Sequence, residues 1–132
     1  MSLKLLIADD EYFIRQRIKK IIPWEKLNLT FAGEAENGQQ VIDHLEKEPV
    51  DLLLLDIKMP QMNGIETARY IKEHFPSVHM LILSGYNDFE YARTVIRYGV
   101  KEYLLKPVAA EELERALSEC IQAIHFEEQT LS

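Results

Sequence analysis

The sequence has little cysteine, little tryptophan and no long apolar segment. Its 132 residues include one cysteine, Cys120, and one tryptophan, Trp24. A single cysteine excludes a disulfide framework within the chain and suits a reducing compartment. No apolar run approaches the roughly 20 residues of a membrane-spanning helix, and the acidic start "MSLKLLIADD" does not resemble a secretory signal. We therefore expect a cytoplasmic protein without a membrane association.

Positive charge is also scarce. Lysine and arginine together number 15 against 22 acidic residues, which gives a formal net charge of −7. A chain of this charge is not expected to bind nucleic acid through its own field. The length suits one domain over residues 1–132. The 47% of hydrophobic residues are enough to fill a core, and no linker rich in proline, glycine or serine divides the chain.

Short apolar runs alternate with segments of helical period, which predicts an α/β fold with a parallel sheet and crossover helices. The expected strands are residues 3–8, 30–35, 51–56, 79–84 and 102–106. Three of these runs are apolar almost throughout, as in strands covered on both faces. The run at 30–35 is more polar and is expected at an edge. The irregular stretch 22–29 contains Trp24, which we expect to cover the core.

The expected helices follow from apolar residues at helical spacing. The first stripe runs from Ile14 to Ile22, and short stripes follow Asn37-Gly38 and Asn63-Gly64. A fourth spans 89–96. The last, residues 113–124, presents one apolar face over three turns. Five helices alternating with five strands predict a (βα)5 arrangement.

Polar residues stand where the predicted strands end. Asp9-Asp10 follow the first strand, Asp56 ends the third, Ser84 ends the fourth and Lys106 ends the fifth. Taken singly, an aspartate here is often a helix cap, but a carboxylate ending four leucines is costly to bury without a partner. In an open parallel sheet, ligands bind beyond the carboxyl ends of the strands. Three acids together need a cation, and Mg²⁺ is the natural candidate.

A cation and a lysine around one carboxylate suit phosphoryl transfer, in which charge on the transferred group must be neutralised. The carboxylate of Asp56 can itself be the nucleophile and form an aspartyl phosphate. The motifs Asp9-Asp10, "DIKMPQMNG", "LSG" and "YLLKP" resemble the receiver domains of two-component response regulators over essentially the whole chain. This resemblance implies the flavodoxin-like fold, with five parallel strands in the order 2-1-3-4-5 and helices on both faces.

The resemblance also implies roles for individual residues. Asp56 accepts the phosphoryl group from a sensor histidine kinase. Asp10 and Asp56 bind Mg²⁺ through their side chains, Lys58 through its backbone carbonyl, and Asp9 mostly through water. Lys106 pairs with a phosphoryl oxygen. The domain would thus catalyse its own phosphorylation and dephosphorylation without acting on a separate metabolite.

Further roles concern the response to phosphorylation. Ser84, where threonine is commoner, donates its hydroxyl to the phosphoryl group, and Tyr103 is the aromatic switch that follows it. Lys58 and Tyr86 occupy positions that tune the lifetime of the phosphoryl group. The Lys106–Pro107 peptide bond is expected to be cis.

"IPWEKLNLTFAGEAENGQQ" and the segment from Leu83 to Val108 resemble the receivers of YesN-type regulators, which carry AraC-type DNA-binding domains. The resemblance implies transcriptional output through a C-terminal DNA-binding domain that these residues do not contain. The surface of the 89–96 helix, the fifth strand and the last helix carries mixed charges. This surface could form a phosphorylation-dependent homodimer, or it could be a solvated face without a partner. Both interpretations stay open.

Three alternative functions make specific demands on the sequence. An FMN-binding domain needs a hydroxyl- and glycine-rich loop where Asp9-Asp10-Glu11 stand. A hydrolase of the haloacid dehalogenase type needs a second acid two residues after the nucleophile, where this chain has Lys58. A degenerate receiver that acts as an interaction module without phosphorylation stays open, although the complete set of polar strand ends argues against it.

Overall fold

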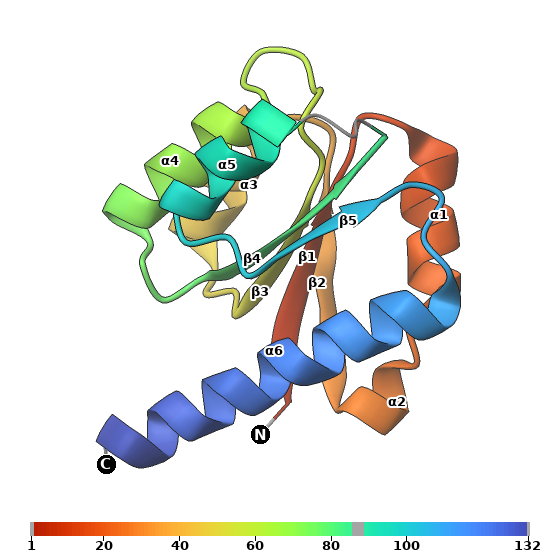
Figure 1. Cartoon of the computed structure of the whole chain (residues 1–132), viewed down its shortest axis with the longest axis vertical. Helices are drawn as coiled ribbons and strands as arrows, with labels where there is room; N and C mark the ends of the chain where they lie inside the picture. The colour runs from red at the N-terminus through yellow and green to blue at the C-terminus, as the bar shows by residue number, and fades with distance from the viewer. Residues whose placement is uncertain (1, 86–88, 132) are drawn as a thin grey trace.

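The computed structural model describes residues 2–85 and 89–131, and they form a parallel sheet covered by helices on both faces (Figure 1). The strands are β1 Leu3–Ala8, β2 Leu29–Ala35, β3 Leu52–Leu55, β4 His79–Ser84 and β5 Glu102–Leu105. Their order is β2-β1-β3-β4-β5, with every neighbouring pair parallel. The predicted fold class, strand order and edge position of β2 are confirmed.

Within residues 2–85 and 89–131, six helices connect and follow the strands. They are α1 Tyr12–Ile21, α2 Trp24–Leu27, α3 Gly38–Lys47, α4 Gly64–His74, α5 Phe89–Arg97 and α6 Ala110–Leu131. Figure 1 shows α3, α4 and α5 on one face of the sheet and α1 and α6 on the other. Among the described residues, no helix is both long and apolar enough to cross a bilayer.

Two apolar layers hold the sheet between these helices. On one face, Leu53 and Leu55 of β3 pack with Ile71 of α4. On the other, Leu52 and Leu54 pack with residues of α1 and α6, among them Ile18, Leu117 and Cys120. All four leucines of β3 are at most 1% exposed. An uninterrupted apolar strand therefore serves both layers, as expected for a strand buried on both faces.

The stretch 22–29 contains the one helix that the sequence pattern did not predict. The short helix α2 ends at Asn28, which has a left-handed backbone (φ 54°). Trp24 packs partly against the core beneath α1, and its indole N–H donates to the carbonyl of Lys19 at 2.9 Å. Trp24 therefore covers the core, as predicted. At the other end of the chain, α6 continues past the predicted 113–124 stripe to Leu131.

Register sets the position of the polar residues at the strand ends. Ala8 of β1 lies opposite Leu55 of β3, so that Asp9 and Asp56 leave the sheet at the same level. In the same way, Ser84 lies opposite Leu105, the residue before Lys106. The backbone N–H of Asp56 donates to the carbonyl of Ala8 at 3.0 Å, which continues the ladder by one bond. The sheet thus delivers these side chains to one edge.

The start of α4 lies directly against the backbone of Asp56. Asn63 and Glu66 form a reciprocal capping box, at 2.9 and 3.2 Å, which begins the helix. The N–H of Gly64 donates to the carbonyl of Ile57 at 2.7 Å. A Cβ on Gly64 would lie 2.1 Å from the Asp56 carbonyl oxygen and 2.8 Å from the Ile57 Cα. Only glycine allows this close approach.

We predict that Gly64→Ala lowers the free energy of unfolding by about 2–3 kcal/mol, because backbone atoms must move to admit the methyl group. Gly85→Ala is the matched control, since a Cβ there meets nothing within 4 Å. Alanine at position 85 should be neutral or stabilise by about 0.5 kcal/mol through the unfolded chain. Urea unfolding measures both variants, and equal effects at the two glycines would contradict the close approach.

Candidate functional site

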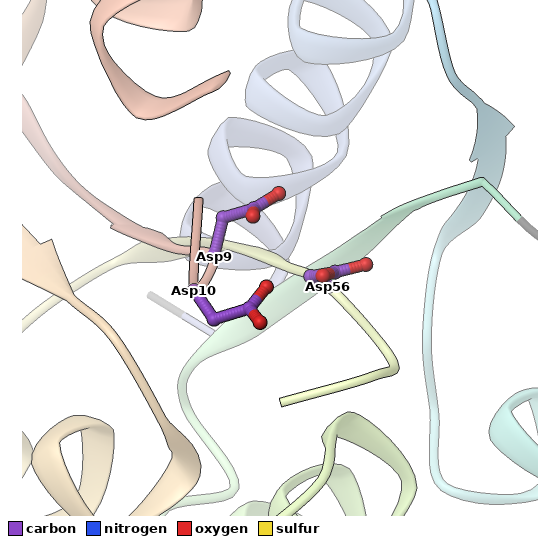
Figure 2. A group of neighbouring side chains, drawn as sticks. All are labelled: Asp9, Asp10 and Asp56. Carbon is purple, nitrogen blue, oxygen red and sulfur yellow. The ribbon is translucent and has the colours of Figure 1, made fainter. Parts of the chain in front are cut away.

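Three carboxylates meet at the carboxyl edge of the sheet. Each of Asp9, Asp10 and Asp56 offers one oxygen, and these oxygens lie within 4.8 Å of one another. Figure 2 shows Asp9 and Asp10 side by side, with Asp56 facing them from the neighbouring strand end. Asp9 and Asp56 are 2% and 5% exposed, whereas Asp10 is exposed. The predicted cluster therefore exists, and it is part-buried.

Backbone donors fix the two buried carboxylates. The N–H of Ile57 donates to Asp56 Oδ1 at 2.9 Å. The N–H of Glu11 donates to Asp9 Oδ1, also at 2.9 Å. Asp9 itself is tied to β2, since its N–H donates to the carbonyl of Ala35 at 3.0 Å. Each carboxylate therefore keeps one oxygen for the shared space.

Lys106 brings positive charge to the buried carboxylates. Its Nζ lies 2.6 Å from Asp9 Oδ2 and 3.4 Å from Asp56 Oδ1. Its backbone N–H donates to the carbonyl of Ser84 at 2.8 Å, which ties the ends of β4 and β5 together. The peptide bond between Lys106 and Pro107 is cis. Residues 97 positions apart thus share one ion pair.

The charges are not balanced within this group. Burial and then the neighbouring Asp9 carboxylate raise the pKa of Asp56 to about 6, although Lys106 and the Ile57 N–H oppose the rise. Burial alone would lower the pKa of Lys106, but the hydrogen bond to Asp9 and the two carboxylate charges raise it above its ordinary value. Lys106 therefore stays charged, and Asp56 lies close to protonation at neutral pH.

The other predicted site residues surround this cluster in different ways. Ser84 is fully buried at the end of β4, and Tyr103 is half-buried in β5, packed against the apolar layer beneath α5. Lys58 is exposed. An open pocket at the site is lined by Asp10, Glu11, Asp56, Lys58, Gly85 and Lys106. Tyr86 lies outside the described residues.

The sequence reasoning missed Arg15, which is 6% exposed. Its Nη1 donates to the carbonyl of Asp9 and its Nε to Glu34 Oε1, both at 2.8 Å. Arg15 stands three residues before Ile18, on the helix face whose apolar stripe predicted α1. A charged residue at such a position is the signal that could have identified a buried arginine.

Comparison with known proteins places the chain in a family. A family model described as "Response regulator receiver domain" matches residues 5–118. The chain belongs to this family. As a receiver domain of response regulators it has its acidic cluster at the carboxyl edge of the sheet, as described above.

Similar proteins include named transcriptional regulators. YesN of Bacillus subtilis, described as an uncharacterized transcriptional regulatory protein, is 38% identical over 118 residues, which are 89% of this chain and 32% of YesN. HptR of Staphylococcus aureus, a transcriptional regulatory protein, is 35% identical over 92% of this chain and 47% of its own length. The chain thus spans a third to a half of these relatives.

A solved structure of a receiver domain is also similar to this chain. The receiver (REC) domain of AraT, a response regulator from Geobacillus stearothermophilus, superposes with a TM-score of 0.90 and is 36% identical. The match covers 97% of this chain and 99% of that one. The predicted resemblance to receivers of YesN-type regulators is confirmed.

The pKa of Asp56 predicts a pH-dependent stability. The pKa of Asp56 is about 6 in the folded protein, above the ordinary 3.8, so the folded state binds the Asp56 proton more tightly than the unfolded state does. The stabilisation that this proton gives is fully present below pH 3.8 and is lost as the pH rises from there to about 6. Without divalent cations, Asp56→Asn should therefore match the wild type in stability near pH 4. It should exceed the wild type by about 2–3 kcal/mol at pH 7, at about 1.4 kcal/mol per pKa unit.

Urea unfolding across this pH range provides the measurement. Asp43→Asn, on the exposed face of α3, is the control that should show no such growth with pH. A difference between wild type and Asp56→Asn that stays constant with pH would contradict the raised pKa.

Proposed function

We propose that this receiver domain accepts a phosphoryl group at Asp56 from a sensor histidine kinase. The observation that supports the proposal is the placement of a buried carboxylate 3.4 Å from the Lys106 ammonium, beside two further carboxylates and open to a pocket. An Asp56 carboxylate fixed by a single backbone bond has a free oxygen for attack on phosphorus. Such chemistry depends on positioning and charge neutralisation.

The donor set fits a hard divalent cation. Asp9, Asp10 and Asp56 carry three negative charges when ionised, and Lys106 supplies one positive charge in return. Burial and the neighbouring Asp9 carboxylate raise the pKa of Asp56 despite the Lys106 charge. Mg²⁺ prefers oxygen ligands and few carboxylates, so we propose that the three aspartates and the Lys58 carbonyl hold it. When bound, it neutralises charge on the transferred group.

The transfer proceeds by in-line displacement. An Asp56 carboxylate oxygen forms a bond to the phosphorus of the kinase phosphohistidine, and the phosphorus–nitrogen bond breaks. The released imidazole takes a proton from water. Lys106 turns from Asp9 toward a phosphoryl oxygen, and the Ser84 hydroxyl donates to another. Hydrolysis of the same acyl phosphate resets the domain, at a rate tuned by Lys58 and Tyr86.

The regulatory effect of phosphorylation would come from a change in the surface formed by α5, β5 and α6. Phosphorylation adds roughly two negative charges at pH 7, and Ser84 moves toward them. Tyr103 then turns into the space that Ser84 leaves, which alters the surface of α5, β5 and α6. Because relatives named transcriptional regulators are two to three times longer than the matched segment, we propose that residues outside this chain bind DNA. We propose a cytoplasmic location for the whole protein.

Incubation with Mg²⁺ and acetyl phosphate tests the central proposal. The wild type should gain an acid-labile phosphoryl group by intact mass, since Asp56 is the nucleophile. Asp56→Asn should gain none, and Asp43→Asn, altered on the exposed face of α3, should gain it as the wild type does. Omission of Mg²⁺ should slow phosphorylation at least about 100-fold, because several kcal/mol of charge stabilisation are lost.

Two outcomes would contradict this proposal. An adduct that persists in Asp56→Asn would move the site elsewhere. A folded wild type without any adduct, whether from acetyl phosphate or from a kinase, would favour the alternative of a degenerate receiver that works as an interaction module.

A homodimer is proposed for the α5–β5–α6 surface because apolar side chains are exposed there. Ile96 of α5 is 63% exposed and Leu105 of β5 is 41% exposed. Two of the charged groups nearby already have partners within the chain: Glu102 pairs with Arg115 at 3.2 Å, and Arg93 with Glu90 at 3.3 Å. The apolar pair is therefore the more direct candidate for contact with a second copy.

Sedimentation with beryllium fluoride as phosphate mimic tests this surface. The wild type should shift from monomer to dimer when the mimic and Mg²⁺ are added. Ile96→Glu should stay monomeric, because a charge would be buried at the contact. Phe13→Glu, which alters an 84% exposed aromatic on α1, should still dimerise. A wild type that stays monomeric would contradict the dimer.

A further inference from the structure

Two arginines of α1 each bind the backbone of a different turn at the site. Arg15 Nη1 donates to the carbonyl of Asp9 at 2.8 Å. Arg17 Nη2 donates to the carbonyl of Val108, also at 2.8 Å, across 91 positions of sequence. Asp9 opens the acidic turn, and Val108 lies two residues after Lys106. One helix therefore contacts two of the three turns that carry the charges of the site.

Arg15 is itself held rigidly. Its Nε donates to Glu34 Oε1 of β2 at 2.8 Å, and Gln16 and Lys19 bind the same carboxylate at 3.0 and 3.3 Å. Partial burial would raise the pKa of Glu34, but the hydrogen bonds from Arg15 and Lys19 outweigh it and hold the pKa below its ordinary value. Glu34 thus stays ionised and fixes a guanidinium that is almost fully buried.

The Arg15 bond acts on the direction of both acidic side chains. The peptide unit between Asp9 and Asp10 is planar, so a donor fixed on its carbonyl also fixes the plane from which Asp10 departs. The other end of Asp9 is fixed by its N–H bond to Ala35. Without Arg15, this plane loses a buried donor, and the directions in which Asp9 and Asp10 leave the backbone are less tightly fixed, although Glu11 and Lys106 still bind the Asp9 carboxylate.

Arg17 acts on the turn that follows β5. The Lys106 backbone is held on one side by its N–H bond to the carbonyl of Ser84. Arg17 holds the other side through Val108, whose apolar side chain packs beneath α1 and α6. Because Arg17 is exposed, its bond contributes less than the buried bond of Arg15.

We propose that Arg15 and Arg17 are positioning residues with separate tasks: Arg15 sets the acidic turn for cation binding, and Arg17 sets the Lys106 turn for phosphoryl transfer. This inference rests on the proposed function of the site. It predicts that the two arginines, two positions apart on one helix, affect different steps.

Calorimetric Mg²⁺ titration and phosphorylation by acetyl phosphate at saturating Mg²⁺ separate these steps. Arg15→Met should raise the Mg²⁺ dissociation constant about 10-fold, the effect typical of residues that orient metal ligands. Arg17→Met should leave this constant unchanged and slow phosphorylation about fivefold, the effect of one ordinary hydrogen bond. Arg17→Lys should restore the rate, because one donor suffices there.

Arg69→Met is the control, since this exposed arginine of α4 pairs only with the surface residue Glu73 in the described contacts. It should behave as the wild type in both measurements. If Arg15→Met does not fold, Arg15→Met combined with Glu34→Gln removes both charges together and should show the same weakened Mg²⁺ binding.

The outcomes distinguish this inference from the proposed function. A wild type that neither binds Mg²⁺ nor becomes phosphorylated overturns both. If the wild type does both, folded arginine variants that match Arg69→Met overturn the positioning roles alone. Equal losses of Mg²⁺ affinity and rate in the two variants also overturn them, because a general structural defect would produce that result.

Discussion

The structure depends on one constraint, the burial of the Asp56 carboxylate next to a second buried carboxylate. Asp9 and Asp56 are almost fully enclosed, and Lys106 lies within ion-pair distance of both. Burial and the neighbouring Asp9 carboxylate raise the pKa of Asp56, and the single Lys106 ammonium does not fully offset them. The folded chain therefore maintains an electrostatic strain that the proposed cation would relieve, and much of its architecture serves to keep these groups in place.

Backbone geometry maintains this arrangement more than side-chain packing does. Parallel register places Asp9 and Asp56 at one level, and ladder-like bonds extend past the strands to both residues. Gly64 lets α4 begin in contact with the Asp56 carbonyl. Because these contacts involve main-chain atoms, the Asp56 carboxylate lies on a rigid edge while the pocket side, with Lys58 and Gly85, remains open.

Most of the fold could be predicted because its signals are local. Apolar runs, the polar-interrupted run at 30–35 among them, identified all five strands to within one residue at either end, and helical stripes identified five helices. The helix α2 was missed because four residues are too few to show a helical spacing of apolar residues. Its C-cap is Asn28 in the left-handed conformation, so the glycine that commonly marks a helix end is not there. Arg15 was missed for a different reason. Its partners, Glu34 and the Asp9 carbonyl, come from separate strands, and only the assembled sheet brings them to α1.

The unbalanced charge around Asp56 also offers a physical reason why phosphorylation there could alter a distant surface. In the proposed mechanism, a phosphoryl group on Asp56 would draw Lys106 away from Asp9 and attract the hydroxyl of the fully buried Ser84. Closely packed interiors do not deform gradually, so the movement of Ser84 must be matched by a neighbour, and half-buried Tyr103 in the adjacent strand is placed to respond. In that mechanism, the electrostatic imbalance at the edge would be coupled to the exposed surface that carries Ile96 and Leu105. A site with balanced charges would lack this coupling, because phosphorylation would meet no cluster poised to rearrange.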